Sequence, residues 1–192
     1  MSVNASNLIL GPAKLYVSPF GTTEPADTSI TPNGASFIPS APWTDVGGTD
    51  GGVTFEVDST YTDLAVDQII MNVGARLTDI KMTVAAKLAE VTLANLNTAL
   101  NSIGTTGGGS GYSTLDIPVT SAASQPTYAA LLVVGWAPGS SMARWVIVRK
   151  LLCQTKAMMT YDKKGQLAYD CTWNAFYVSS TIPPVHITDE LT

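Results

Sequence analysis

The segment from Arg76 to Leu88 alternates apolar and polar residues, and this pattern constrains the fold more than any other feature of the chain. One face would carry Ile80, Met82, Val84, Ala86 and Leu88, and the other would carry Asp79, Lys81, Thr83, Ala85 and Lys87. Successive side chains of a strand point to opposite faces of a sheet, whereas a helix would scatter both groups around its circumference. The alternation therefore predicts a half-buried strand that packs its aliphatic side against a core.

Strand patterns occupy much of the remaining chain. Val53 to Asp58 alternates in the same way after a glycine-rich turn. Further segments have the composition of strands, namely Lys14–Ser18, Tyr61–Val66, Ile69–Val73, Ala129–Trp136 and Met142–Leu152. The last of these is apolar on both faces, which is typical of a strand that is covered on both sides.

A second alternating strand is predicted from Gln166 to Val178. Its apolar face would carry Leu167, Tyr169, Cys171, Trp173, Ala175 and Tyr177, and its polar face would carry Gln166, Asp170, Thr172 and Asn174. The turn-forming residues Asp162–Gly165 precede it, so we expect a hairpin with Thr155–Tyr161 as the other strand.

One helix is predicted, over residues 92–101. Thr92 is a suitable N-cap, and Leu93, Leu96 and Leu100 recur at helical spacing. The glycine-rich residues 104–111 are expected to end the helix and to form a flexible linker. Together these elements predict a mainly β protein, a sandwich or barrel of about eight strands with one short flanking α-helix.

Three segments lack any regular pattern. Residues 1–11 are predicted to be an N-terminal arm and residues 179–192 a C-terminal arm, on either side of a domain that spans 12–178. Within that domain, residues 21–42 are predicted to be a long proline-containing loop. The first segment has neither the basic region nor the apolar core of a secretory signal. No apolar run reaches the roughly 20 residues that a membrane helix needs. We therefore expect synthesis in the cytoplasm and no membrane partner.

The charge of the chain bears on its partners. Only 13% of the residues are charged, against about 25% in typical soluble domains. Surface with so little charge is often buried against another subunit. The formal net charge is −5, and specific nucleic-acid binding would instead need clustered Lys and Arg.

Candidate catalytic and metal-binding residues are few. His186 is the one histidine and falls in the unpatterned tail, and Cys153 and Cys171 belong to no CxxC motif. Asp58, Asp63 and Asp67 lack the spacing of a calcium loop. The glycine run near residue 107 lacks the following Lys and helix of a phosphate-binding loop. We therefore expect no enzymatic activity and no cofactor.

The order of features resembles a known family. The opening segment GPAKLYVSPFGTTEP leads to Trp43–Gly47 and then to Thr49–Phe55. The long alternating strand closes with Leu88–Thr92 at the start of the helix, and GQLAYDCTWNAF forms the late strand. This arrangement is similar to the major tail proteins, or tail tube proteins, of long-tailed siphophages, especially those that infect actinobacteria.

The resemblance implies a structural virion protein. Family members form hexameric rings that stack into a hollow tube, through which DNA passes without specific binding. Tape-measure and tail terminator proteins would be further partners, and the mature location would be the phage tail. Contacts between subunits or rings would come from the termini and the long loop, with candidates Leu8, Leu10, Phe37, Trp43, Val185 and Ile187. Gln166, Asp170, Thr172 and Asn174 would be candidates to line the lumen.

Two other readings of the sequence stay open. The chain could form the tube of a secretion system or a contractile injection system, which uses a similar fold. It could instead be a carbohydrate-binding β-sandwich module in which an exposed Trp43 stacks on sugar. The other tryptophans, Trp136, Trp145 and Trp173, lie in apolar strands and are expected in a core or an interface.

Overall fold

The computed structural model describes residues 7–9, 11–30, 38–119, 123–139, 142–163 and 165–191. Within these ranges the protein is mainly β, with one eight-stranded antiparallel sheet, a separate two-stranded sheet and one α-helix. The strands of the large sheet are β1 (Lys14–Pro19), β2 (Thr44–Asp45), β3 (Thr49–Val66), β4 (Ile69–Leu88), β7 (Ala129–Trp136), β8 (Ala143–Cys153), β9 (Tyr169–Ala175) and β10 (Val185–Asp189). The predicted fold class is confirmed. None of the helices in these ranges is long and apolar enough to cross a membrane.

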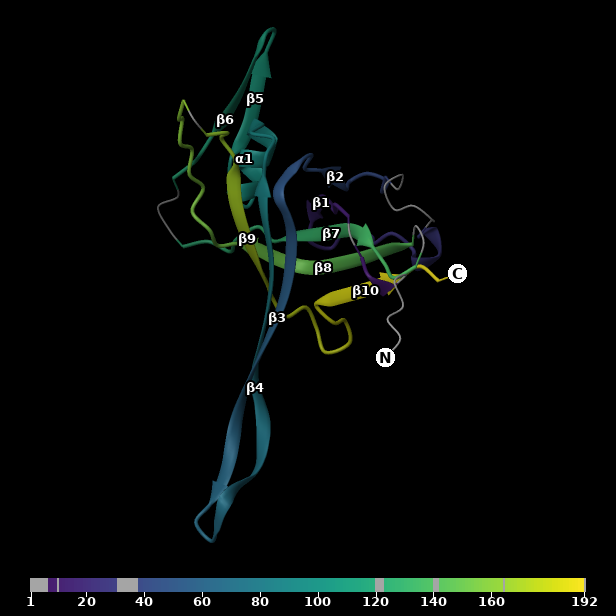
Figure 1. The fold of residues 1–192 in the computed structure, drawn as a ribbon. Helices are drawn as coiled ribbons and strands as arrows, with labels where there is room; N and C mark the ends of the chain where they lie inside the picture. The colour runs from purple at the N-terminus through teal and green to yellow at the C-terminus, as the bar shows by residue number, and fades with distance from the viewer. Residues whose placement is uncertain are drawn as a thin grey trace.

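The large sheet forks at β8. Its strands follow the order β2-β1-β7-β8-β9-β4-β3, and β10 also pairs with β8. Residues 144–148 of β8 pair with β10, whereas Leu151–Cys153 pair with β9. The branch that contains β9, β4 and β3 therefore runs away from the branch that ends in β10 (Figure 1).

Two hydrophobic clusters lie on the two faces of the central strands. Along β8, Val146 and Val148 belong to a large cluster that also contains Val84, Cys171 and Trp173. The intervening residues of β8 belong to a smaller cluster, which includes Trp145, Ile147, Leu132, Tyr16 and Trp43. β8 is therefore apolar on both faces because each face packs into one of the two clusters.

The helix α1 (Leu93–Ala99) covers part of the larger cluster. The Thr92 side chain accepts a hydrogen bond from the Asn95 backbone N–H at 3.1 Å, so the predicted N-cap is confirmed. Leu96 and Ala99 are buried in the cluster. The helix is shorter than predicted because Asn101 adopts a positive φ of 56° and its side chain bonds to the backbone of Cys153.

The glycine-rich segment is not a linker, and that prediction was wrong. It forms β5 (Thr105–Gly109), which pairs with β6 (Tyr112–Asp116) in a small separate sheet. Gly111 makes the turn with a φ of 88°, a conformation that glycine adopts without steric cost. Backbone hydrogen bonds stabilise this hairpin. Because they do not depend on alternating apolar side chains, the sequence shows no strand pattern here.

The expected hairpin between Thr155–Tyr161 and Gln166–Val178 is also absent from the described residues. Residues 154–163 and 165–168, which the structure describes, contain no strand. Instead β9 pairs along Thr83–Leu88 of β4 and with the end of β8. β9 thus pairs with strands that are distant in the chain and not with the segment next to it. A pattern of neighbouring residues cannot predict such long-range pairing.

The C-terminal segment is likewise more ordered than predicted. Val185–Asp189 forms β10 and pairs with β8 from Val148 to Arg144. The domain therefore continues past residue 178, and the prediction of an unpatterned arm over 179–192 was wrong for these residues. Five residues are too few for a period to stand out, and the free edge of β8 supplies their hydrogen bonds.

Candidate interaction surfaces

The most unusual surface of the molecule is the outer part of β3 and β4, which we call the arm (Val57–Met82). β9 accompanies β4 only from Thr83 to Leu88, and beyond that point β3 and β4 continue as a two-stranded ribbon. Figure 1 shows this ribbon projecting well past the rest of the molecule. The sequence predicted its strands separately and did not indicate that they leave the body of the protein.

The arm is amphipathic because residues opposite each other in an antiparallel pair share a face. Apolar side chains dominate one face, in the pairs Val57↔Met82, Ser59↔Ile80 and Tyr61↔Leu77. Polar and charged side chains form the other, in the pairs Asp58↔Lys81, Thr60↔Asp79 and Thr62↔Arg76. The apolar face is uncovered, since Val57 is 51% exposed and Tyr61 is 62% exposed.

The tip of the arm is still more exposed. Val66 and Ile69 flank a two-residue connection, and Ile69, Ile70 and Met71 are exposed side by side in the chain, with Ile70 fully open to solvent. Large exposed apolar patches on a soluble chain mark interaction sites.

Both edges of the arm are free of strand partners within the described part of the chain. The large sheet ends at β3, and β9 does not reach Ile69–Met82 of β4. An exposed edge strand presents a row of unpaired backbone groups that can pair with another chain.

The predicted lumen-facing residues are partly brought together. Asp170, Thr172 and Asn174 lie opposite Lys87, Ala85 and Thr83 of β4, so they share the polar face that continues onto the arm. Gln166 precedes β9 and lies outside any strand. A hydrogen bond from the Lys87 ammonium to the Asp50 carboxylate, at 2.7 Å, raises the pKa of Lys87.

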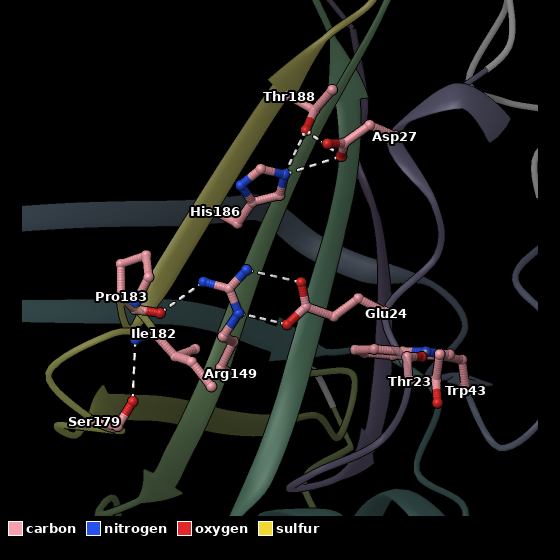
Figure 2. Close-up of polar contacts among 10 residues, drawn as sticks. All are labelled: Thr23, Glu24, Asp27, Trp43, Arg149, Ser179, Ile182, Pro183, His186 and Thr188. Carbon is pink, nitrogen blue, oxygen red and sulfur yellow. Dashed lines mark hydrogen bonds and ion pairs between the residues drawn. The ribbon is translucent and has the colours of Figure 1, made fainter.

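A second group of polar contacts joins the 21–30 segment to the C-terminal strand (Figure 2). We call it the clamp. The Arg149 guanidinium of β8 donates Nε and Nη2 to the two carboxylate oxygens of Glu24, and Nη1 donates to the Pro183 carbonyl at 2.6 Å. All three hydrogen bonds are charge-assisted, and the carboxylate contact is bidentate.

Asp27 forms the other half of the clamp. It lies in the short 3-10 helix Asp27–Ser29, and its Oδ1 lies 2.9 Å from the His186 Nε2 and accepts a 2.8 Å hydrogen bond from the Thr188 hydroxyl. These two hydrogen bonds hold the pKa of the Asp27 carboxyl below its usual value. His186 therefore lies on an ordered strand, β10, and is bonded to Asp27. The sequence analysis had placed it in an irregular tail.

The residues predicted to contact other subunits differ in how exposed they are. Leu8 is 71% exposed, Ile187 is 52% exposed and Val185 is half-buried, so their contact role stays a prediction. Leu10 and Phe37 lie outside the described residues. Trp43 was predicted to be exposed, but it is only 7% exposed, and its Nε1 donates to the Thr23 carbonyl at 3.1 Å. It is therefore not an exposed platform for sugar stacking.

The two cysteines are free and buried on neighbouring strands. The hydrogen bond with Cys153 and burial both raise the pKa of the Cys171 thiol.

Asp63 of the arm accepts a 2.7 Å hydrogen bond from Asn72 Nδ2. Within the described ranges, no three His, Cys, Asp or Glu residues are grouped closely enough to hold a metal ion.

The arm could have been found from the sequence by one signal. Between Val53 and Leu88 the chain contains strand-like residues and no proline, and it changes direction only once, at Asp67–Gln68.

Comparison with known proteins adds no family assignment, because no protein-family model and no curated protein sequence matches the chain.

Proposed function

We propose that this chain is the structural subunit of a phage tail tube, in which stacked hexameric rings form the conduit for DNA ejection. The observation that carries the proposal is the arm, which leaves an apolar face and two strand edges uncovered. A two-stranded ribbon is marginally stable in water by itself. Copies of the same chain would cover both the face and the edges.

Repetition of one contact can build such an assembly. A head-to-tail interface closes into a ring when its rotation allows, and it continues as a filament when it does not. The arm and the body are different surfaces of one chain, which suits a head-to-tail contact. The number of six copies in a ring, and the tape-measure and terminator partners, come from the resemblance to the tail tube family.

The polar face of β9, β4 and β3 supports a conduit that does not bind DNA. Its carboxylates, Asp50, Glu56, Asp58, Asp79 and Asp170, outnumber its cations, Arg76, Lys81 and Lys87. A face with this balance repels phosphates within a Debye length of about 8 Å. DNA would then move along it without a fixed grip.

Microscopy of the purified protein tests the assembly. We expect negative-stain images to show rings or tubes, and light scattering to report a mass that rises with protein concentration. A chain that stays monomeric at every concentration would contradict the proposal. Terminase and tape-measure genes beside this one would favour a phage tail over the tube of a secretion or contractile system.

The conduit is tested on assembled particles. Thr172→Lys and Asn174→Lys would place two cations on the proposed lumen face while leaving the core untouched. We expect tubes to form normally and genome ejection to slow. Unchanged ejection would show that this face does not line the channel.

A further inference from the structure

The body of the protein carries a small apolar pocket beside the clamp. It has a volume of about 240 Å³, and its apolar lining includes Phe20, Trp43, Ala130, Ile147, Val178 and Ile182. This volume is far above the roughly 10–15 Å³ that one water needs, so the pocket has room for a branched aliphatic side chain.

The walls of this pocket are held in place. Trp43 is anchored by its hydrogen bond to Thr23, and the Ile182 backbone N–H donates to the Ser179 hydroxyl at 3.0 Å. Figure 2 shows these residues around the Arg149–Glu24 pair. A receptor that is ordered before binding loses little conformational freedom when a ligand enters.

The charges at the pocket do not call for a charged ligand. The Arg149 guanidinium is engaged by both oxygens of Glu24 and by the Pro183 carbonyl. The pair is therefore neutral as a whole and directionally satisfied, and the remaining lining is mostly aliphatic and aromatic. An uncharged, apolar side chain is the chemistry that fits.

The described chain offers such a side chain at the arm tip, where Ile70 is fully exposed. A copy cannot fill its own pocket, because Figure 1 shows the tip far from β7 and β8, which contribute Ala130, Ile147 and Arg149 to the pocket. A contact between tip and pocket therefore needs two copies. It joins unlike surfaces and leaves one free tip and one free pocket, so it can propagate.

We propose that this pocket receives the arm tip of a second copy of the chain, with Ile70 as the inserted side chain. The inference rests on the proposed function, since it names the surface that the arm contacts. Ile69 and Met71, which are also exposed, would cover the rim.

Two single variants and their mixture test this contact. Ile70→Asp replaces the apolar side chain of the tip by a carboxylate, and Ile182→Asp places a carboxylate in the lining of the pocket. Val119→Asp is a matched control at an exposed apolar position outside both. We expect either interface variant to raise the concentration needed for assembly by about tenfold or more, as for loss of a central interface residue. The control should assemble like the wild type.

The mixture gives the sharper result. The tip variant keeps its pocket and the pocket variant keeps its tip, so an equimolar mixture can make one intact contact and no chain of contacts. We expect dimers of the two variants by light scattering, and monomers of each variant alone. Thermal unfolding of the separate variants checks that each is folded.

A cross-link protects the test against a misfolded variant. Ile70→Cys on one copy and Phe20→Cys on another should form a disulfide-linked dimer under mild oxidation, and neither alone should do so. Loss of assembly in the tip variant with full assembly in the pocket variant, or no cross-link, would overturn the inference while wild-type tubes still supported the proposed function. A wild type that never assembles would overturn both.

Discussion

The body and the arm of this protein are built from the same kind of strand but are stabilised differently. In the body, β7 and β8 are covered on both faces, and their side chains fill two clusters. In the arm, the alternation of β3 and β4 is equally regular, yet its apolar face packs against nothing in the described chain. The comparison shows that an alternating pattern reports a face that must be covered and does not tell which molecule covers it.

The largest effect is expected in the body. Trp173→Ala removes a fully buried ring from the larger cluster and should lower the free energy of unfolding by about 3–5 kcal/mol. Urea denaturation followed by fluorescence or circular dichroism measures the change. Tyr61→Ala on the arm is the matched control and should change it by less than about 0.5 kcal/mol. Equal losses at the two positions would erase the distinction between body and arm.

The next effect is on assembly. Val57→Asp combined with Tyr61→Asp places two charges on the apolar face of the arm and should weaken self-association about 30-fold, the factor for about 2 kcal/mol at an interface hot spot. Sedimentation across a concentration series measures this. Thr60→Asp on the polar face of the arm serves as the control. Normal assembly of the double variant would show that the apolar face is not an interface.

The clamp should have an effect of similar size, but on the stability of the single chain. Arg149→Ala removes three hydrogen bonds and leaves Glu24 without its partner, so the free energy of unfolding should fall by about 2 kcal/mol. Chemical denaturation is the measurement, and Lys156→Ala is a control at an exposed cation. No loss would mean that the 21–30 segment is held by its other contacts, namely the Asp27 and Thr23 hydrogen bonds and the smaller hydrophobic cluster.

The smallest effect is a pH dependence. The pKa of Asp27 is lowered in the folded protein, so its contribution to stability is present above its unfolded pKa and is lost as the pH falls through the lower folded value. Because this carboxyl is largely exposed, the contribution is at most about 0.5 kcal/mol. Asp27→Asn should flatten the stability of the protein between pH 5 and pH 3, which denaturant titrations at each pH would reveal. A variant as acid-sensitive as the wild type would contradict this origin.

Several elements were predictable because their information is local. The alternation of residues 76–88 identified a strand and the side chains that share each of its faces, although on the aliphatic face only Val84, Ala86 and Leu88 are buried and Ile80 is exposed. Thr92 identified the start of the only α-helix in the described ranges. The polar face of Asp170, Thr172 and Asn174 followed from the same two-residue period. Each signal depends on the steric preferences of neighbouring residues, which the sequence displays directly.

Other elements depend on partners that are distant in the chain. β10 is a strand because β8 has an open edge at residues 144–148, and Trp43 is buried because the 21–30 segment and β8 surround it. The clamp joins residues that are more than 100 positions apart. No local pattern could indicate these contacts.

By itself, the sequence determined that this protein is mainly β, where its most regular strands run, and which side chains share a face of each strand, because side-chain alternation is a property of consecutive residues. Only the tertiary structure decided that β9 pairs with β4, that the C-terminal strand joins the body, and that the arm leaves it. Those outcomes depend on which strand edges remain free once the core has packed, and that competition involves the whole chain.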